Sequence, residues 1–475
     1  MSTFSGLNTA YSGLVAARMG LDVVGQNIAN ANTQGYTRQR IETSALSPTA
    51  QTGLFSNGIS VGQGVTVDGV ARLGSAQLDA QVRFSSGTAG YTAVRANSLS
   101  AIEASLNEPG ESGLSAKLGE FWASWQDLAN GADSPAAAPL LLGASSEVVG
   151  QIKEGYQAVS SEWSSVRNDL NGMVSELNSA AGQVADLNRS IRATLASGGS
   201  GGSVNEMIDQ RSTLTTTIAA LTGATVRELA DGTVDVIIGG NALVSGDRAH
   251  ALDSSGAAGI SDAMSDAANN PHLVWRESSR AGTPVMVDSG EIAGALSMLA
   301  NGGPLTAAAD SYNSFAVHLA TTVNDIYGEP PYFDLGTGPA ATGLAVVPTT
   351  GSEVRAGDPT VGPYDGSIAD AIAQLGAGKA VDEFGVAIES PDSVWARFVT
   401  GLGVSTQGEL QQATVASSSA TSAAGRQLAN ASVDLDEENV NLLMFQHAYQ
   451  GAARVLTAVD EMLDTLINRT GLVGR

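Results

Sequence analysis

A single periodic run of apolar residues limits most strongly what this chain can fold into. Between residues 148 and 195, apolar side chains recur at alternating steps of three and four. The members of the run are Ile152, Tyr156, Val159, Trp163, Val166, Leu170, Met173, Leu177, Ala180, Val184, Leu187 and Ile191. That spacing gives an α-helix one apolar face. A helix of about 48 residues is roughly 70 Å long, so the sequence predicts a rod.

A shorter run with the same spacing precedes the rod. It consists of Leu114, Leu118, Phe121, Trp125 and Leu128, and two prolines at 135 and 139 separate it from the longer run. Because proline favours a turn, we expect the shorter helix to fold back antiparallel against the rod. A stripe of this kind is packing surface far more often than a cofactor site.

Both ends of the chain carry an apolar seam at heptad spacing, which is typical of a coiled coil. We expect these seams to form the assembly interface. Its residues are Phe4, Leu7, Tyr11, Leu14, Leu21, Ile28, Leu435, Leu442, Phe445, Tyr449, Leu456, Val459, Leu463 and Leu466. Gly6, Gly13 and Gly20 also recur at heptad intervals, which predicts a smooth strip beside the first seam where another backbone can approach closely.

The first helix should be poorly stable alone, because each interior glycine costs about 0.5–1 kcal/mol relative to alanine. Pairing two ends that lie about 400 residues apart costs roughly 5 kcal/mol if the intervening chain is flexible. A folded rod whose own ends lie together removes most of that cost. We therefore expect terminal helices that become ordered chiefly through contact with neighbouring molecules.

The remaining segments divide between helix and strand. Residues 29–39 should end the first helix and lead into a strand, and residues 58–70 alternate like a β-hairpin. Residues 197–203 predict a turn and lack the lysine of a phosphate loop. Further helices are expected at 205–221, within 292–326, at 393–402 and at 410–428, and strands at 234–238, 272–275 and 284–287.

These elements predict a mainly α, multidomain α+β fold, with a long helical bundle and coiled coil from the two ends and an inserted β domain. We expect residues 1–85 and 430–475 to form a terminal coiled-coil polymerisation domain with an extended hairpin. Residues 86–222, 290–327 and 391–429 would form a helical rod domain. Residues 223–289 would be the inserted β domain, and residues 328–390 a second, loop-rich insertion.

The charge balance argues against several classes of partner. The 475 residues include 48 acidic and 23 basic side chains, a net charge of -25. Such a chain lacks the cations that neutralise nucleic-acid phosphates or anionic membranes. No stretch approaches the roughly 20 apolar residues of a membrane helix, and the first residues do not resemble a secretory leader. If the protein is exported, we expect another route.

No catalytic, metal or cofactor site is expected. The chain has no cysteine, which excludes disulfides and thiolate ligands. His250, His272, His318 and His447 are isolated in sequence, and no serine lies in a nucleophile elbow with plausible partners. The acidic cluster Asp434, Asp436, Glu437 and Glu438 lacks the glycine and spacing of a calcium loop. It is better interpreted as negative charge at the start of the last helix.

Both ends of the chain carry short motifs. Residues 7–14 read LNTAYSGL, and a second motif spans residues 27–39. The motif residues are Asn27, Asn30, Asn32, Thr33, Gly35, Tyr36, Thr37, Arg38 and Gln39. These N-terminal motifs resemble the signature shared by flagellar rod, hook and hook-associated proteins, and residues 433–438, 446–450 and 464–468 resemble the matching C-terminal signature.

Within that superfamily, residues 35–39 (GYTRQ) resemble the family of the first hook-associated protein, FlgK. Asn205, Asp209 and Arg211 also match that family's Asn-x-x-x-Asp-x-Arg helix. Ser212 stands where the family usually has Asp, and Gln34 where it often has Pro.

The resemblance implies a structural subunit of the junction between hook and filament, required for motility, and not an enzyme. Implied partners are copies of itself, the flagellar hook protein, a second junction protein of the hook-associated protein 3 type, and an export chaperone at the C-terminal helix. No cofactor, nucleic acid or membrane is implied. Such a protein would be secreted by flagellar type III export and would be extracellular.

Two other functions remain open from the sequence. The flagellar hook protein, or another axial rod or hook subunit, shares both terminal signatures, although a hook protein would be expected to have a β-dominated middle. A secreted enzyme or adhesin would place its activity in residues 224–287 or 327–382.

Overall fold

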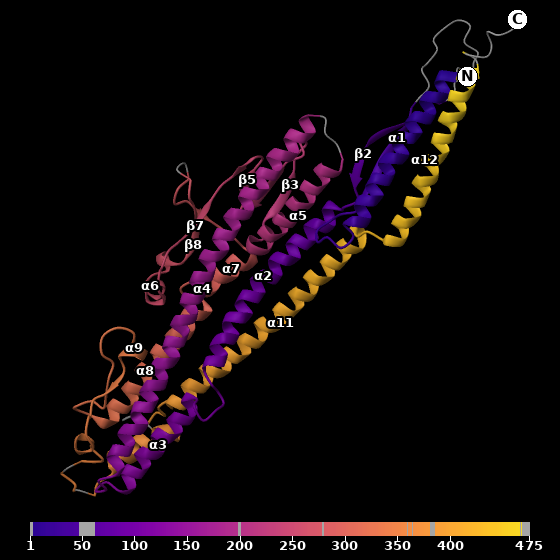
Figure 1. Cartoon of the computed structure of the whole chain (residues 1–475). Coiled ribbons are helices and arrows are strands. Elements are labelled where there is room, and N and C mark those ends of the chain that lie inside the picture. Colours follow the sequence, from indigo (N-terminus) through magenta and orange to yellow (C-terminus); the bar gives the residue numbers. More distant parts are fainter. Residues whose placement is uncertain are drawn as a thin grey trace, which may run out of the picture.

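The computed structural model describes residues 3–46, 62–197, 201–277, 280–358, 360–362, 364–380, 385–465 and 467. The molecule is elongated, and the chain runs away from one end and returns to it, so that the first and last helices lie side by side (Figure 1). Most of its length is helical, with small antiparallel sheets, which confirms the predicted mainly α fold with inserted β structure. None of the described helices has the length and hydropathy needed to cross a bilayer.

The α-helices are α1 (Thr3–Ala29), α2 (Ala76–Ser105), α3 (Leu114–Asn130), α4 (Ala137–Ala196), α5 (Gly202–Thr222), α6 (Ile260–Ser265), α7 (Gly290–Leu299), α8 (Pro304–Tyr327), α9 (Ala340–Gly343), α10 (Ser367–Gly376), α11 (Pro391–Ala431) and α12 (Leu435–Asp464). The strands are β1 (Gln39–Ala45), β2 (Val65–Arg72), β3 (Thr225–Glu228), β4 (Val234–Ile238), β5 (Asn241–Ser245), β6 (Arg248–Ala249), β7 (Leu252–Ser255), β8 (His272–Trp275), β9 (Pro284–Val285), β10 (Phe333–Asp334) and β11 (Ala345–Val346).

The predicted rod is the unbroken 60-residue helix α4. Residues of its apolar stripe are buried at nearly every turn, including Val148, Trp163 and Ile191. As predicted, α3 folds back against α4. The Nζ atom of Lys117, near the start of α3, lies 2.8 Å from the carboxylate oxygen Oε2 of Glu147 in α4. An aromatic cluster at this end of the rod includes Trp125 and Tyr332, whose ring centroids are 5.0 Å apart.

The sequence analysis did not predict the pairing of α2 with α11. The helix α2 runs along α11, but its buried positions are mostly small or polar, such as Ser85, Thr92 and Ala96. A helix of this composition has no apolar stripe for sequence analysis to detect. The prediction of two helices at 393–402 and 410–428 is wrong, because α11 continues through the glycines between them.

The two sheets between residues 225 and 285 contain the predicted strands β4, β8 and β9, together with β3, β5, β6 and β7, which were missed. Near the N-terminus, β2 pairs antiparallel with β1, with Gln39 opposite Arg72. The alternation at 58–70 therefore marks one strand of a longer hairpin, and residues 58–61 lie outside the described part. Residues 328–390 are loop-rich as expected but include the unpredicted helix α10, whose Ile372 and Leu375 are buried.

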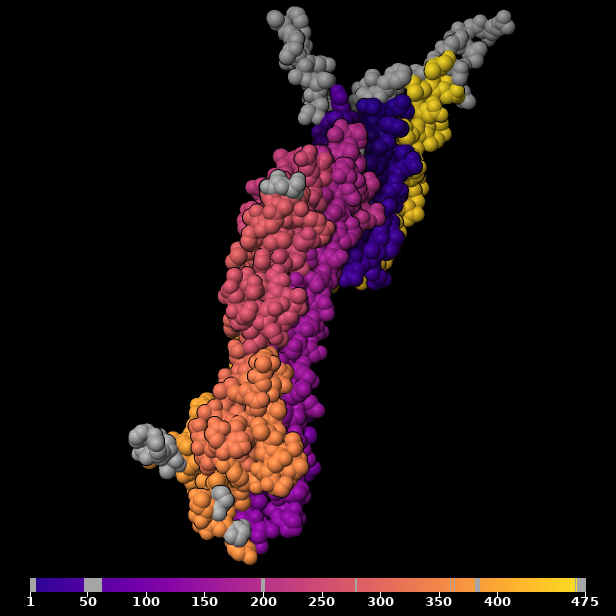
Figure 2. Space-filling view, turned by 90° about the vertical axis from the view of Figure 1, so that its left-hand side faces the viewer, coloured from indigo at the N-terminus to yellow at the C-terminus, as the bar shows by residue number. Residues whose placement is uncertain are grey.

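Both insertions lie along the same side of the rod (Figure 2). From the end that holds the termini, the order is the terminal helices, the β-rich residues 225–285, and then the loop-rich residues 328–390. The terminal helices are therefore separated from the second insertion by most of the length of α4.

Candidate assembly site at the base of the terminal helices

The helices α1 and α12 pack along one another through a narrow strip of small residues. Between residues 6 and 29 of α1, the buried positions are Ala10, Ala17, Gly20, Val24 and Asn27. At Gly20 the approach is close, because an added Cβ would lie 2.5 Å from a ring carbon of Phe445. A Cβ at Gly6 or Gly13 would meet nothing within 4 Å. Of the three glycines at heptad spacing, Gly20 is thus the one that packs closely against another helix of this chain.

Most of the predicted seam is only partly covered. Leu7, Leu14, Leu21, Ile28, Leu442, Phe445, Leu456 and Leu463 are partly buried, and Val459 is buried. Tyr11 is 60% exposed, while Leu435 and Tyr449 are also exposed. The side chain of Phe4 and residue Leu466 lie outside the described part of the chain. Pairing within one molecule therefore leaves much of this apolar surface open.

Each helix also carries an exposed apolar stripe whose members, apart from the predicted Tyr11, were missed by the sequence analysis. On α12 it contains Val440, Met444, Val455 and Met462, which are 65%, 54%, 49% and 51% exposed. On α1, Tyr11, Val15 and Met19 follow one another at four-residue steps and line a hollow of about 410 Å³ against β2. The four-residue steps are visible in the sequence, but the sequence does not show which face of each helix the fold covers.

A buried carboxylate joins the base of α12 to the N-terminal segment. Glu438 is 1% exposed and accepts hydrogen bonds from Arg38 Nε at 2.9 Å and Asn27 Nδ2 at 3.0 Å. Arg38 also pairs with the exposed Glu437. Burial lowers the pKa of the Arg38 guanidinium, but its hydrogen bonds and charge interactions with Glu437 and Glu438 outweigh that effect and raise the pKa overall. Asp434 caps α12 by accepting from the backbone N–H groups of residues 436 and 437.

Asn27 connects the end of α1 to the start of β1. Its Oδ1 accepts from Tyr36 Oη at 2.9 Å and from the Gln39 backbone N–H at 3.0 Å. Its Nδ2 also donates to the Gln39 carbonyl at 2.9 Å. Burial, together with the charges of Asp209, Glu438 and Glu206, raises the pKa of the Tyr36 hydroxyl to about 12. Tyr36 therefore remains a hydrogen-bond donor at neutral pH.

The helix α5 binds this segment to the rod through two residues of the family motif. Asp209 accepts from the Thr37 backbone N–H at 3.0 Å and pairs with Arg72 of β2. Asn205 donates to Gln39 Oε1 at 3.2 Å and to the Val70 carbonyl at 2.9 Å. The name "hub" is used below for Asn27, Tyr36, Thr37, Arg38, Gln39, Arg72, Asn205, Asp209 and Glu438.

The third residue of that motif faces the other way. Arg211 donates to Asn188 Oδ1 of α4 at 2.9 Å and to the Gly232 carbonyl at 2.7 Å. Burial lowers the pKa of its guanidinium to about 10. Asn188 in turn donates to the Val234 carbonyl at 2.8 Å. One turn of α5 therefore joins the terminal segment on one side to the rod and the first β-sheet on the other.

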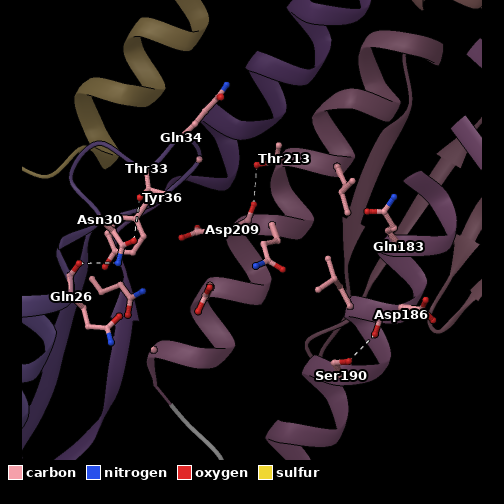
Figure 3. A pocket seen from close by; sticks show the side chains of 17 residues that line it. Gln26, Asn30, Thr33, Gln34, Tyr36, Gln183, Asp186, Ser190, Asp209 and Thr213 are labelled. Carbon is pink, nitrogen blue, oxygen red and sulfur yellow. Dashed lines mark hydrogen bonds between the residues drawn. The ribbon is translucent and has the colours of Figure 1, made fainter. Parts of the chain in front are cut away.

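The other motif residues line a cavity of about 670 Å³ between the end of α1 and the helices α4 and α5 (Figure 3). Asn30, Thr33, Gly35 and Tyr36 lie on one side, and Asp186 with Ser190 lies on the other. Asn32 is exposed. Thr33 donates to Asn30 Oδ1 at 3.2 Å, so these residues shape the turn after α1.

The described residues contain no group of three or more His, Asp or Glu side chains that could hold a metal ion. The site combines buried hydrogen-bonded ion pairs with exposed apolar stripes.

Comparison with known proteins identifies the family. Residues 99–329 match the family described as the flagellar hook-associated protein FlgK helical domain. Residues 7–37 match flagella basal body rod proteins, and residues 427–469 match the C-terminal part of flagellar basal body rod FlgEFG proteins. The two terminal matches cover most of α1 and α12, and the central match covers α3 to α8.

Among individual proteins, flagellar hook-associated protein 1 of Bacillus subtilis is 28% identical, and the alignment covers 100% of both chains. The protein of the same name from Salmonella typhimurium is 32% identical over 52% of this chain and 43% of its own length. The structure of the flagellar hook junction protein FlgK from Burkholderia pseudomallei shares the fold, with a TM-score of 0.62 and 14% identity over 73% of this chain and 99% of that one. The chain belongs to the FlgK family of flagellar hook-associated proteins.

Proposed function

We propose that this protein is a structural subunit of the flagellar hook junction that assembles through α1 and α12. The observation that carries the proposal is the terminal helix pair, whose two exposed apolar stripes face away from the rod's own core. Exposed apolar stripes at helical spacing are suited to packing against further helices. Copies of the same chain supply such helices.

The hub gives this interface a defined base. Glu438, Arg38 and Asn27 hold the start of α12 beside the end of α1, and Asp209 with Asn205 holds the same segment on α5. A buried charged network of this kind favours one arrangement of α1 relative to α12. The two helices are thereby presented at the end of the rod as one unit.

The proposal favours a junction subunit over the hook protein itself. The central helical match belongs to a hook-associated family, and the 60-residue helix α4 occupies the part of the chain where a hook protein was expected to be β-dominated. The names of the relatives support an extracellular position in the flagellum. Type III export, contact with hook protein and a second junction protein, and chaperone binding to α12 are part of the same proposal.

Deleting residues 435–475 tests the proposal. We expect a soluble chain with a folded rod that cannot join the hook, because one helix of the terminal pair and half of the exposed apolar surface are gone. Flagella would be examined by electron microscopy in cells whose own junction protein has been removed. Normal filaments from the truncated chain would contradict the proposal.

Single substitutions test the same proposal at individual residues. Val455→Asp places a charge on the exposed stripe of α12, whereas Val361→Asp places one on the second insertion, at a residue that is 73% exposed. Both should leave the rod folded, because neither side chain is buried. Val455→Asp should reduce filament number by at least about tenfold, since a charge buried in an interface costs several kcal/mol. Equal effects of the two substitutions would place the assembly surface elsewhere.

A further inference from the structure

The helix α11 changes character along its length. Its first part packs into the aromatic core, where Trp395 is 2% exposed and its ring centroid lies 5.5 Å from that of Phe315 in α8. After Thr406 its buried residues are Ala416 and Ala423 alone, and this whole helix is described. Small side chains bury little apolar area. The second part of α11 is therefore held against α2 by a thin seam.

Polar contacts at the two ends of this second part supplement the seam. Glu409 accepts from Arg95 Nε of α2 at 2.9 Å. At the other end, Gln427 donates to Asp79, and Asn430 donates to the Leu73 carbonyl at 3.2 Å. The Arg95 and Glu409 side chains are largely buried, at 18% and 13% exposure, so this pair fixes the start of the second part to α2. The polar contacts of the second part of α11 with the segment 73–105 therefore lie near its two ends.

Three glycines of α11, Gly401, Gly403 and Gly408, lie where its buried side chains change from large to small. A Cβ at Gly401 or Gly408 would meet nothing within 4 Å, and one at Gly403 would be in ordinary contact with Glu103. Alanine would fit at each position and is a better helix former than glycine. By contrast, a Cβ at Gly90 of α2 would lie 2.7 Å from the Ala220 carbonyl oxygen. Packing within the chain requires glycine in α2 but not in this part of α11.

The structure also leaves room for α11 to bend at this point. A groove of about 700 Å³ runs along Gly401 and Gly408, with Gly302 and Pro304 at the start of α8 on its opposite side. The helix α4 has no comparable freedom, because it is buried at nearly every turn from Ala138 to Ile191. We therefore do not expect α4 to bend together with α11.

We propose that residues 401–408 form a hinge that lets the terminal helix pair tilt relative to the rigid helix α4. The contacts between α5 and residues 37–39 act as the pivot, and the second part of α11 transmits the tilt. The glycines absorb the resulting bend. A subunit of this design could meet neighbours at more than one angle without breaking its hub.

Spin labels can measure this movement, since the full-length chain has no cysteine of its own. One label is placed on α4 by Ser161→Cys and a second beyond the glycines by Val415→Cys. The reference pair combines Ser161→Cys with Ala396→Cys, before the glycines. All these positions are exposed. We expect the 161/415 distance distribution to be about twice as broad as that of the reference pair.

Alanine substitutions separate the hinge from a general gain in helix stability. Gly401→Ala, Gly403→Ala and Gly408→Ala together should narrow the 161/415 distribution to the width of the reference pair. Gly172→Ala with Gly182→Ala in α4, where an added Cβ also meets nothing, should leave it broad. The reference pair verifies the fold of each variant.

Two results would overturn the proposal: equal widths for both label pairs in the unsubstituted chain, or an unchanged 161/415 width in the triple variant. Equal narrow widths combined with failed assembly of the triple variant would assign the glycines to close contact with another molecule instead.

Discussion

The Glu438 carboxylate lies where the end of α1, the start of β1 and the base of α12 meet. It is almost fully buried, and its partners Arg38 and Asn27 come from the other end of the chain. Its neighbour Glu437 contacts the same arginine, but its side chain is 61% exposed. Two adjacent acidic residues therefore offer a matched comparison between a buried and an exposed partner of Arg38.

Glu438→Ala should lower the stability of the terminal pair by about 2 kcal/mol, because it removes the buried carboxylate that accepts hydrogen bonds from Asn27 and Arg38 and leaves Arg38 with its exposed partner Glu437. Glu437→Ala should cost less than about 1 kcal/mol, as is typical of exposed pairs. Amide hydrogen exchange of α1 and α12 in the full-length chain measures both effects. Similar exchange rates in the two variants would show that the buried pair does not hold the helices together.

At the level of the helices, the parts that the sequence predicted are those with a sustained apolar period. The helix α4 was predicted because a large side chain faces its core at each turn. The helix α2 was not, because it packs through serine, threonine, alanine and glycine at close range. Glu438 was interpreted only as charge at a helix N-terminus, since nothing local indicates a partner about 400 residues away. The motif residues were recognised from resemblance, but their contacts required the fold.

The pairing of α1 with α12 yields a second matched comparison. Gly13→Ala should stabilise α1 by up to about 1 kcal/mol, because its Cβ meets nothing. Gly20→Ala should instead destabilise the pair by about 1–3 kcal/mol, because its Cβ would overlap the Phe445 ring. Thermal unfolding and amide exchange of α12 give the measurement. Adding Phe445→Ala should remove the difference between the two alanine variants, and persistence of that difference would argue against this contact.

At the scale of the whole molecule, the net charge of -25 opposes bringing copies together. Charges interact over about 10 Å at 0.1 M salt, so added salt should weaken the repulsion while leaving the apolar contacts intact. We expect self-association of the purified chain to tighten by about tenfold as sodium chloride rises from roughly 0.02 M to 0.3 M. Sedimentation velocity measures this, with sucrose of equal osmolarity as the control. Weaker association in salt would indicate that ion pairs between copies dominate the interface.

The chain runs out along α2, back along α4, out again through α7 and α8, and back along α11, which places both termini at one end of the molecule and the second insertion at the other. Residues grafted into the loops of the second insertion would therefore be displayed far from the helices that join copies together. Such a scaffold could carry a foreign peptide in a repeating array while its attachment end keeps its own sequence.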